Sequence, residues 1–294
     1  QKKLYNNNKS SNVTTTSSSL LLEQRDDMGR TVLDLAIMKK QSLLFDLFCS
    51  FELEQSPQTH GLIHNRDQRG EFTIHKAVET GNVYFLRQLI DLGADVNAMD
   101  ATNHNTPLMI AVCNQYGDCV DLLLERGASV MPVDKRHRTA VHYATFLCDI
   151  HTVNTLVRYV QQNDNKRDAA STSNEASHRT TSLSRRPSTT NNRNHTAATV
   201  ATKAKSGSVA VASPLHIAVK KHNLPLIRLF LSLHSSSTAM DEPLLTNLLC
   251  NVFAMDAQGR SPFMEAARLG FDDILELFHE HAVQLQQQSG TNDN

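Results

Sequence analysis

The sequence predicts an all-α protein in which helix pairs stack side by side as a repeat array. Six segments of the 294-residue chain are near-copies of one another, and each ends on an alanine. Ala77, Ala111 and Ala144 follow one another at spacings of 34 and 33 residues. The other copies end on Ala36, Ala218 and Ala266, where spacings of 41, 74 and 48 residues indicate insertions. A unit that recurs at a nearly fixed period is typical of stacked repeat architectures.

Each copy opens with residues that favour a tight turn. The first, second and sixth copies carry Asp-x-x-Gly, which ends at Gly29, Gly70 and Gly259. Glycine adopts positive φ without steric cost, and aspartate hydrogen-bonds to nearby backbone N–H groups. His104 and His137 stand at the glycine position in the third and fourth copies, which predicts altered turns there.

A first helix is predicted after each turn. Thr106, Ser213 and Ser261 each precede a proline. A hydroxyl side chain that caps the helix, followed by proline at the first helical position, is typical of a helix start. Leu108 and Ala111 are three residues apart and therefore share one face of that helix. We expect the alanine to be small because neighbouring helices approach closely there.

A second helix is clearest in the second copy. Val83, Leu86, Leu89 and Ile90 recur at helical spacing and predict a buried stripe, and Gly93 is placed to end the helix. Such a helix pair can bury its apolar face only against the next pair, so the stack itself supplies the core.

These features together resemble the ankyrin-repeat family. Residues 67–77 read DQRGEFTIHKA, residues 93–97 read GADVN, and residues 106–108 read TPL. The spacing of the central copies is close to the roughly 33-residue ankyrin period. The resemblance implies an ankyrin-repeat solenoid of helix-turn-helix pairs joined by β-hairpin-like loops. At one shared repeat position it also implies histidines that hydrogen-bond between neighbouring turns, namely His75, His142 and His216.

The resemblance further implies a non-enzymatic scaffold or adaptor that binds another protein through a concave surface of hairpin tips and first helices. On the first helices the matching positions are Glu79, Thr80, Cys113 and Asn114. At the tips the expected partner-binding residues are Gln68, Arg69, Glu71, Thr102, Asn103, Asn105, Lys135, Arg136 and Arg138.

The fourth tip concentrates positive charge. Lys135, Arg136 and Arg138 lie within four residues of one another, with Arg126 nearby in the sequence. One interpretation is a solvated turn, because exposed charge runs are common. The other is a contact with an acidic patch on a protein partner, which the location at a tip favours.

Composition outside the repeats indicates low-complexity segments. We expect ankyrin repeats 1–4 at 23–160 and repeats 5–6 at 211–283, with a helical insertion near 235–250. Segments 1–22, 161–210 and 284–294 are too polar to bury a core and are expected to be disordered. The 161–210 insertion is basic and rich in Ser, Thr and Asn, and its Ser182 and Ser188 follow arginines, which makes them phosphorylation candidates.

Charge and motifs exclude several function classes. The formal net charge of −1 does not favour nucleic acid, and no apolar run is long enough for membrane insertion. Five scattered cysteines favour reduced thiols in the cytoplasm or nucleus. Catalytic, cofactor-binding and metal-binding motifs are absent from the sequence. We expect Cys113, Cys119 and Cys148 to be buried or half-buried thiols, and His279 and His281 to lie on a solvated helix end.

Two alternatives keep the repeats but change their setting. In one, the chain is the substrate-recruiting or regulatory fragment of a larger enzyme, such as a ubiquitin-ligase adaptor or a kinase. In the other, it is the cytosolic repeat region of a membrane channel. The first residue is Gln1 rather than methionine, which mildly favours a fragment.

Overall fold

The computed structural model describes residues 24–54, 63–175, 212–236 and 251–289. These residues are helices joined by turns, and their only strand-like pairings are two isolated bridges at the first two tips. The chain divides into two compact units, Gln1–Tyr143 and Ala144–Asn294, with the division inside helix α8 (Ala140–Phe146). None of the described helices is both long and apolar enough to cross a bilayer.

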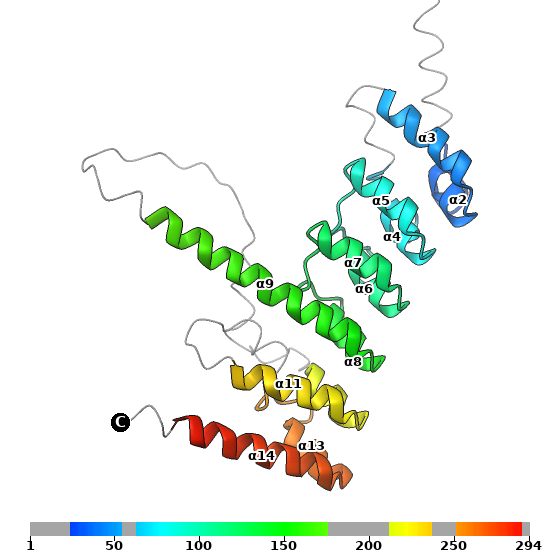
Figure 1. Ribbon diagram of the computed structural model, residues 1–294. Coiled ribbons are helices and arrows are strands. Elements are labelled where there is room, and N and C mark those ends of the chain that lie inside the picture. Colours follow the sequence, from blue (N-terminus) through cyan, green and yellow to red (C-terminus); the bar gives the residue numbers. More distant parts are fainter. Residues whose placement is uncertain (1–23, 55–62, 176–211, 237–250, 290–294) are drawn as a thin grey trace, which may run out of the picture. The chain divides into compact units, whose positions relative to one another are not determined.

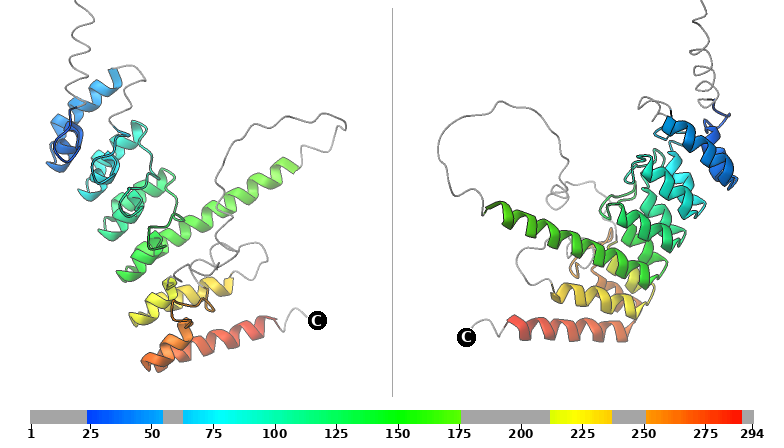
Figure 2. Two further views of the ribbon diagram at one scale, coloured as in Figure 1. Left: turned by 180° about the vertical axis from the view of Figure 1, so that it is seen from behind. Right: turned by 45° about the horizontal axis from the view of Figure 1, so that its top comes forward.

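Unit 1 is a stack of helix pairs (Figures 1 and 2). The pairs are α2 (Val32–Met38) with α3 (Ser42–Glu54), α4 (Thr73–Glu79) with α5 (Val83–Asp91), and α6 (Pro107–Cys113) with α7 (Gly117–Glu125). First helices α2, α4 and α6 pack on one another, and second helices α3, α5 and α7 form a parallel row behind them. Ala36, Ala77 and Ala111 are buried where the first helices meet. The predicted all-α stack of helix pairs is confirmed.

Helix starts follow the predicted capping chemistry. The Thr106 hydroxyl accepts a hydrogen bond from the Met109 backbone N–H at the start of α6. Ser261 does the same for the Met264 N–H in unit 2. Each hydroxyl satisfies a backbone donor that has no partner within its own helix.

The turns at His104 and His137 are not altered, so that prediction was wrong. Both residues adopt the left-handed conformation, with φ of 61° and 57°, close to the 72° of Gly70. The carboxylates of Asp100 and Asp134 explain why a side chain is tolerated here. Each accepts backbone N–H groups from within its own turn, at 2.6 to 2.9 Å, and so holds the loop in this conformation.

The buried face of α5 differs in part from the predicted stripe. Leu86 and Leu89 are fully buried, whereas Val83 and Ile90 are only half-buried. Phe85 is also fully buried, and its ring centroid lies 4.7 Å from that of Phe45 on α3. Because α5 packs against α3 as well as α7, its buried face is turned toward Phe85.

Unit 2 contains α9 (Ile150–Glu175) and two stacked pairs. The pairs are α10 (Pro214–Lys220) with α11 (Leu224–Ser236), and α13 (Pro262–Leu269) with α14 (Asp272–Ser289). Helix α10 packs on α13 and α11 packs on α14, so this unit repeats the two-row arrangement (Figure 1).

Two helices run past the expected boundaries. Helix α9 continues to Glu175 and α14 to Ser289, past the boundaries expected near residues 161 and 284. Neither extension contains Gly or Pro, and without a helix breaker the first turns propagate. Segment 1–22, residues 176–210 with Ser182 and Ser188, most of 235–250, and residues 290–294 lie outside the described residues.

Candidate protein-binding surface

The hairpin tips of unit 1 form a row held together by backbone hydrogen bonds. The N–H groups of Gln68, Ala101 and Lys135 donate to the carbonyl oxygens of Met28, Gly70 and Asn103, at 3.0, 3.1 and 2.8 Å. Each tip is therefore positioned by its neighbour. A surface whose backbone is already ordered loses little conformational entropy when a partner docks.

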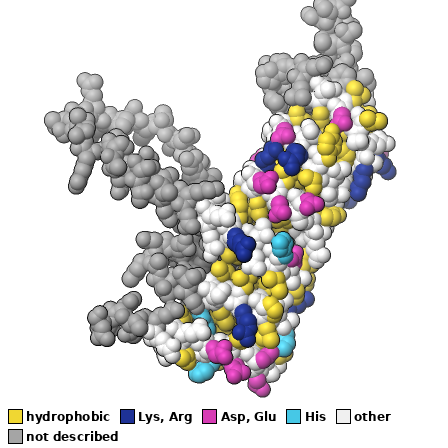
Figure 3. All heavy atoms as spheres, in the orientation of Figure 1, with side chains coloured by type: hydrophobic (Ala, Val, Ile, Leu, Met, Phe, Trp, Pro, Cys, Tyr) yellow, Lys and Arg dark blue, Asp and Glu magenta, His cyan; other side chains and the backbone are white. Residues whose placement is uncertain are grey.

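All nine predicted tip residues lie on this row. Gln68, Arg69, Thr102, Asn103, Lys135 and Arg136 are exposed, whereas Glu71, Asn105 and Arg138 are half-buried. Over unit 1, the space-filling view shows basic and acidic side chains interspersed with hydrophobic ones (Figure 3). The nine tip residues themselves include cations, one carboxylate, amides and a hydroxyl, so the row presents mixed chemistry along several repeats.

Arg138 is less available than the sequence suggested. Its guanidinium lies 2.7 Å from the Asp134 carboxylate, donates to the Tyr143 hydroxyl at 2.7 Å, and stacks on the Tyr143 ring. Burial and the hydrogen bond to Asp134 raise the pKa of Tyr143 to about 12. Arg126 is likewise paired with Asp91, on α5. The positive charge that the fourth tip exposes to solvent therefore comes mainly from Lys135 and Arg136.

Lys135 and Arg136 supply that outward charge. The Lys135 ammonium donates to the Ala101 carbonyl oxygen at 2.9 Å, and among the described residues it forms no ion pair. Arg136 is exposed, and within the same part of the chain its guanidinium has no acidic partner. Arg69, on the second tip, is likewise exposed and has no acidic partner among the described residues.

Glu71 is also engaged within its own tip. Its carboxylate lies 3.1 Å from the ammonium of Lys76, which is itself 2.6 Å from Asp67. This three-residue ion cluster sits beneath the second tip and stabilises the turn. A partner that approached Glu71 would compete with an existing ion pair.

Beside the tips, the first helices of unit 1 enclose a hollow of about 200 Å³. It is lined by Glu79, Asn105, Met109, Ile110, Cys113, Asn114 and Tyr143. We call it the first-helix groove. It joins a predicted tip residue to three of the predicted first-helix positions.

Cys113 is exposed there, so the expectation of a buried thiol was wrong at this residue. Cys113 ends α6 on the side that faces the groove, whereas Cys119 is buried.

Ile110, Tyr143 and Met109 were missed as groove residues. Ile110 and Tyr143 occupy the same repeat position, directly before Ala111 and Ala144, the alanines on which the third and fourth copies end. In the second repeat that position is Lys76, which points inward to its carboxylates. The repeat register therefore grouped Ile110 with Tyr143, but it could not predict that they face the groove, because the side chain at this position points in different directions in different repeats.

Comparison with known proteins agrees with this geometry. A family model described as ankyrin repeats, in three copies, matches residues 52–134 and 74–168. The chain is an ankyrin-repeat protein. A solved structure of the ankyrin repeat domain of Bcl-3 aligns with a TM-score of 0.57 at 19% identity, over 90% of this chain and 89% of that one. At that identity the likeness shows the fold.

Each curated relative matches about a third of this chain. Transient receptor potential channel pyrexia of Drosophila melanogaster is 35% identical over 94 residues, which is 32% of this chain and 10% of that protein. The B-cell lymphoma 3 protein homolog of Mus musculus is 36% identical over 93 residues, 32% and 21% of the two chains. NF-kappa-B inhibitor cactus of Drosophila yakuba is 31% identical over 127 residues, 35% and 26%. The matched part of this chain therefore spans about a quarter or less of each of these three relatives.

The expected ankyrin histidine contacts are confirmed at two positions. Nε2 of His75 lies 3.1 Å from the Ala98 carbonyl oxygen and 3.2 Å from that of Asn105, in the loop of the next repeat. His216 reaches the Arg260 carbonyl oxygen at 2.9 Å in the same way. These rings hold neighbouring repeats together, so their role is structural.

His142 makes the stack sensitive to acid. Its Nδ1 accepts the Thr139 backbone N–H at 3.1 Å, and burial lowers its pKa to about 4. The unfolded chain binds this proton near pH 6.5, so the folded state loses stability as the pH falls from about 6.5 to about 4. We expect a loss of about 2 to 3 kcal/mol from this residue across that window. Urea unfolding at pH 7 and pH 4.5 measures it.

The variant His142→Gln is the control for this prediction. Glutamine keeps a hydrogen-bonding side chain but does not titrate, so the variant should lose less stability than the native chain over the same pH range. His75 and His216, whose pKa values burial also lowers, contribute to the remaining dependence. Equal losses in the two proteins would contradict the assignment to His142.

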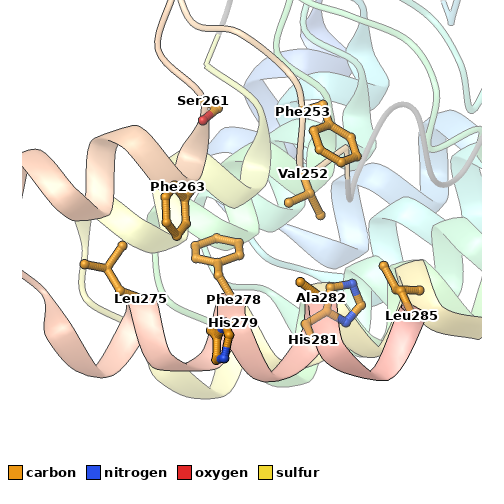
Figure 4. Close-up of a pocket in the computed structure, with 10 residues that line it drawn as sticks. All are labelled: Val252, Phe253, Ser261, Phe263, Leu275, Phe278, His279, His281, Ala282 and Leu285. Atoms are coloured by element: carbon orange, nitrogen blue, oxygen red, sulfur yellow. The ribbon is translucent and has the colours of Figure 1, made fainter. Parts of the chain in front are cut away.

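Unit 2 contains a larger, apolar hollow of about 440 Å³ (Figure 4). Val252 and Phe253 from the loop, Phe263 from α13 and Phe278 from α14 line it, with the rings of Phe263 and Phe278 6.0 Å apart. Polar groups in its lining are few, namely Ser261, His279 and His281. It provides hydrophobic contact area on the last helix pair but no arrangement suited to catalysis.

The two histidines of α14 have different environments. His279 is exposed as expected, but His281 is only 6% exposed, so the prediction of a solvated helix end was wrong for His281. It lies four residues after the buried Leu277, on the face of α14 that packs toward α11.

Proposed function

We propose that the chain is a non-enzymatic ankyrin scaffold or adaptor, which binds another protein through the tip row and first-helix groove of unit 1. Ankyrin repeats are modules for protein–protein interaction, and the tip row is the single observation that carries the assignment to this surface. Its backbone is ordered by hydrogen bonds from tip to tip, while its side chains remain exposed.

The free cations of the row indicate the charge of the partner. Arg69, Lys135 and Arg136 are exposed and lie on the tips of unit 1. A partner with an acidic patch would meet them without first breaking an ion pair within this chain. Complementary charge of this kind speeds association and fixes orientation.

A charge reversal at Arg136 tests the proposal. Arg136→Glu should weaken capture of the principal partner about tenfold, because a like charge would then face the acidic patch, and that loss corresponds to about 1.4 kcal/mol. The measurement is affinity capture from cells by the full chain with quantitative mass spectrometry, followed by a direct titration with the recovered partner.

Arg87→Glu provides the matched control. Arg87 is an exposed residue of α5, in the second row of helices, and carries the same charge change away from the tips. The two variants should differ, with partners lost only for Arg136→Glu. If both recover the same proteins in the same amounts as the native chain, the tip row is not the binding surface.

A second candidate function places the same surface within a larger polypeptide. Relatives of this chain include a protein named as a channel and one named as a probable E3 ubiquitin-protein ligase of Oryza sativa, in which the match spans 10% and 16% of the relative. In that setting the repeats would recruit a partner for an activity encoded elsewhere. The complete reading frame distinguishes the two candidates.

A further inference from the structure

Glu79 is the one acidic residue among those lining the first-helix groove. It is the last residue of α4, where the partial charge at a helix C-terminus is negative and favours a cation. Asn105, Asn114 and Tyr143 share the lining with it, and the Tyr143 hydroxyl already bonds to Asp134 and Arg138. Met109, Ile110 and Cys113 supply the apolar part of the groove.

The Glu79 carboxylate has no ion-pair partner within the described residues. The nearest lysine in its helix, Lys76, is held by Asp67 and Glu71 at 2.6 and 3.1 Å. Glu79 is an exposed residue, but the groove partly desolvates its carboxylate, which raises its pKa. The neighbouring Glu71 charge raises this pKa further, while Lys76 and Arg69 oppose the increase only in part. A carboxylate in this condition is stabilised by any cation that comes to it.

We propose that the first-helix groove binds a lysine or arginine side chain of the partner protein. The aliphatic stem would lie along Met109, Ile110 and Cys113, and the charged end would reach the Glu79 carboxylate and the Asn114 amide oxygen. This assignment rests on the proposed binding function and specifies the chemistry of one of its contacts.

Other occupants fit less well. An acidic side chain would face Glu79 directly, and a purely apolar one would remove water from the carboxylate without replacing it, which costs free energy. The hollow of about 200 Å³ is also smaller than the ~300–1,000 Å³ of typical small-molecule sites. A long side chain with an apolar stem and a cationic end satisfies both parts of the lining.

The partner would therefore carry two kinds of charge. Acidic residues would meet Lys135 and Arg136 at the fourth tip, and a basic residue would enter the groove formed by α4, α6 and the first part of α8. Opposite charges in a defined order make binding more selective than a single acidic patch would, because a uniformly charged partner is repelled at one of the two places.

Selection from a random peptide library by mRNA display tests this assignment with the full native chain. Peptides enriched on the native chain should carry Lys or Arg at one fixed position, and that preference should disappear on Glu79→Gln. Glu125→Gln, the same change at an exposed residue of α7 outside the groove, should leave it unchanged. Urea unfolding checks that both variants fold as the native chain does.

Titration of one selected peptide then measures the contact. Glu79→Gln should weaken its Kd about tenfold, and replacing the basic residue of the peptide with Met should do the same, without a further loss when both changes are combined. Peptides that depend on Arg136 but show no basic position would overturn the groove assignment and leave the proposed function standing. Failure to select any peptide would count against both.

Discussion

Replacing Lys76 with alanine is expected to lower the free energy of unfolding of the chain by about 3 to 5 kcal/mol, the usual cost of removing one partner from a buried ion pair. The Lys76 side chain is only 3% exposed, and its ammonium lies 2.6 Å from Asp67, whose side chain is 4% exposed. Without the ammonium, Asp67 would remain buried with its charge uncompensated, and Glu71 would stand close to it.

The pKa directions of the two partners agree with a favourable pair. Burial opposes both charges, but the hydrogen bond from Lys76 holds the pKa of Asp67 below its ordinary value. Asp67 and Glu71 in turn raise the pKa of Lys76 against the effect of burial. Each charged form is therefore stabilised by the other in the folded state.

Urea unfolding followed by circular dichroism at neutral pH measures the loss, and a double variant controls for it. Lys76→Met combined with Asp67→Asn removes both charges, while an asparagine can still accept the backbone N–H groups that Asp67 accepts from Arg69 and Glu71. The double variant should be more stable than Lys76→Ala. A loss below about 1 kcal/mol for Lys76→Ala, as for a solvent-exposed pair, would contradict the buried-pair interpretation.

The fold could be predicted because its determinants are local and repeated. Thr106 and Ser261 cap helices through atoms three residues away, and Ala77 and Ala111 are small wherever two first helices meet. Such features recur in each copy and reinforce one another. The turn at His104 was misjudged because the carboxylate that supports it, Asp100, outweighs the missing glycine.

The candidate site could be predicted only in outline. Repeat register placed the tip residues on one surface, but it could not show that Arg138 is paired with Asp134 and stacked on Tyr143. Those contacts depend on which way each side chain turns after the repeats have stacked. The first-helix groove needed the same information, since Ile110 and Tyr143 share a register position with the inward-facing Lys76.

Replacing Gly70 with alanine is expected to destabilise the chain by about 2 to 5 kcal/mol. Gly70 has φ of 72°, a conformation that costs an L-residue roughly 1 to 2 kcal/mol. A Cβ atom there would lie 2.2 Å from the Ala101 Cβ and 3.1 Å from the Ala101 nitrogen. The next tip would have to move, at a further cost of about 1 to 3 kcal/mol, typical of an overpacked site.

Gly259→Ala separates the two contributions. Gly259 occupies the equivalent turn of the sixth repeat with φ of 70°, but no atom of the described residues lies within 4 Å of a Cβ atom there. It should lose only the roughly 1 to 2 kcal/mol of the backbone conformation. Equal losses in urea unfolding would show that the second and third tips are not in close contact. If Gly70→Ala loses more stability than Gly259→Ala and also captures the partner more weakly, then the Ala101–Gly70 hydrogen bond supports binding as well as stability. The reason is that this bond aligns the second and third tips.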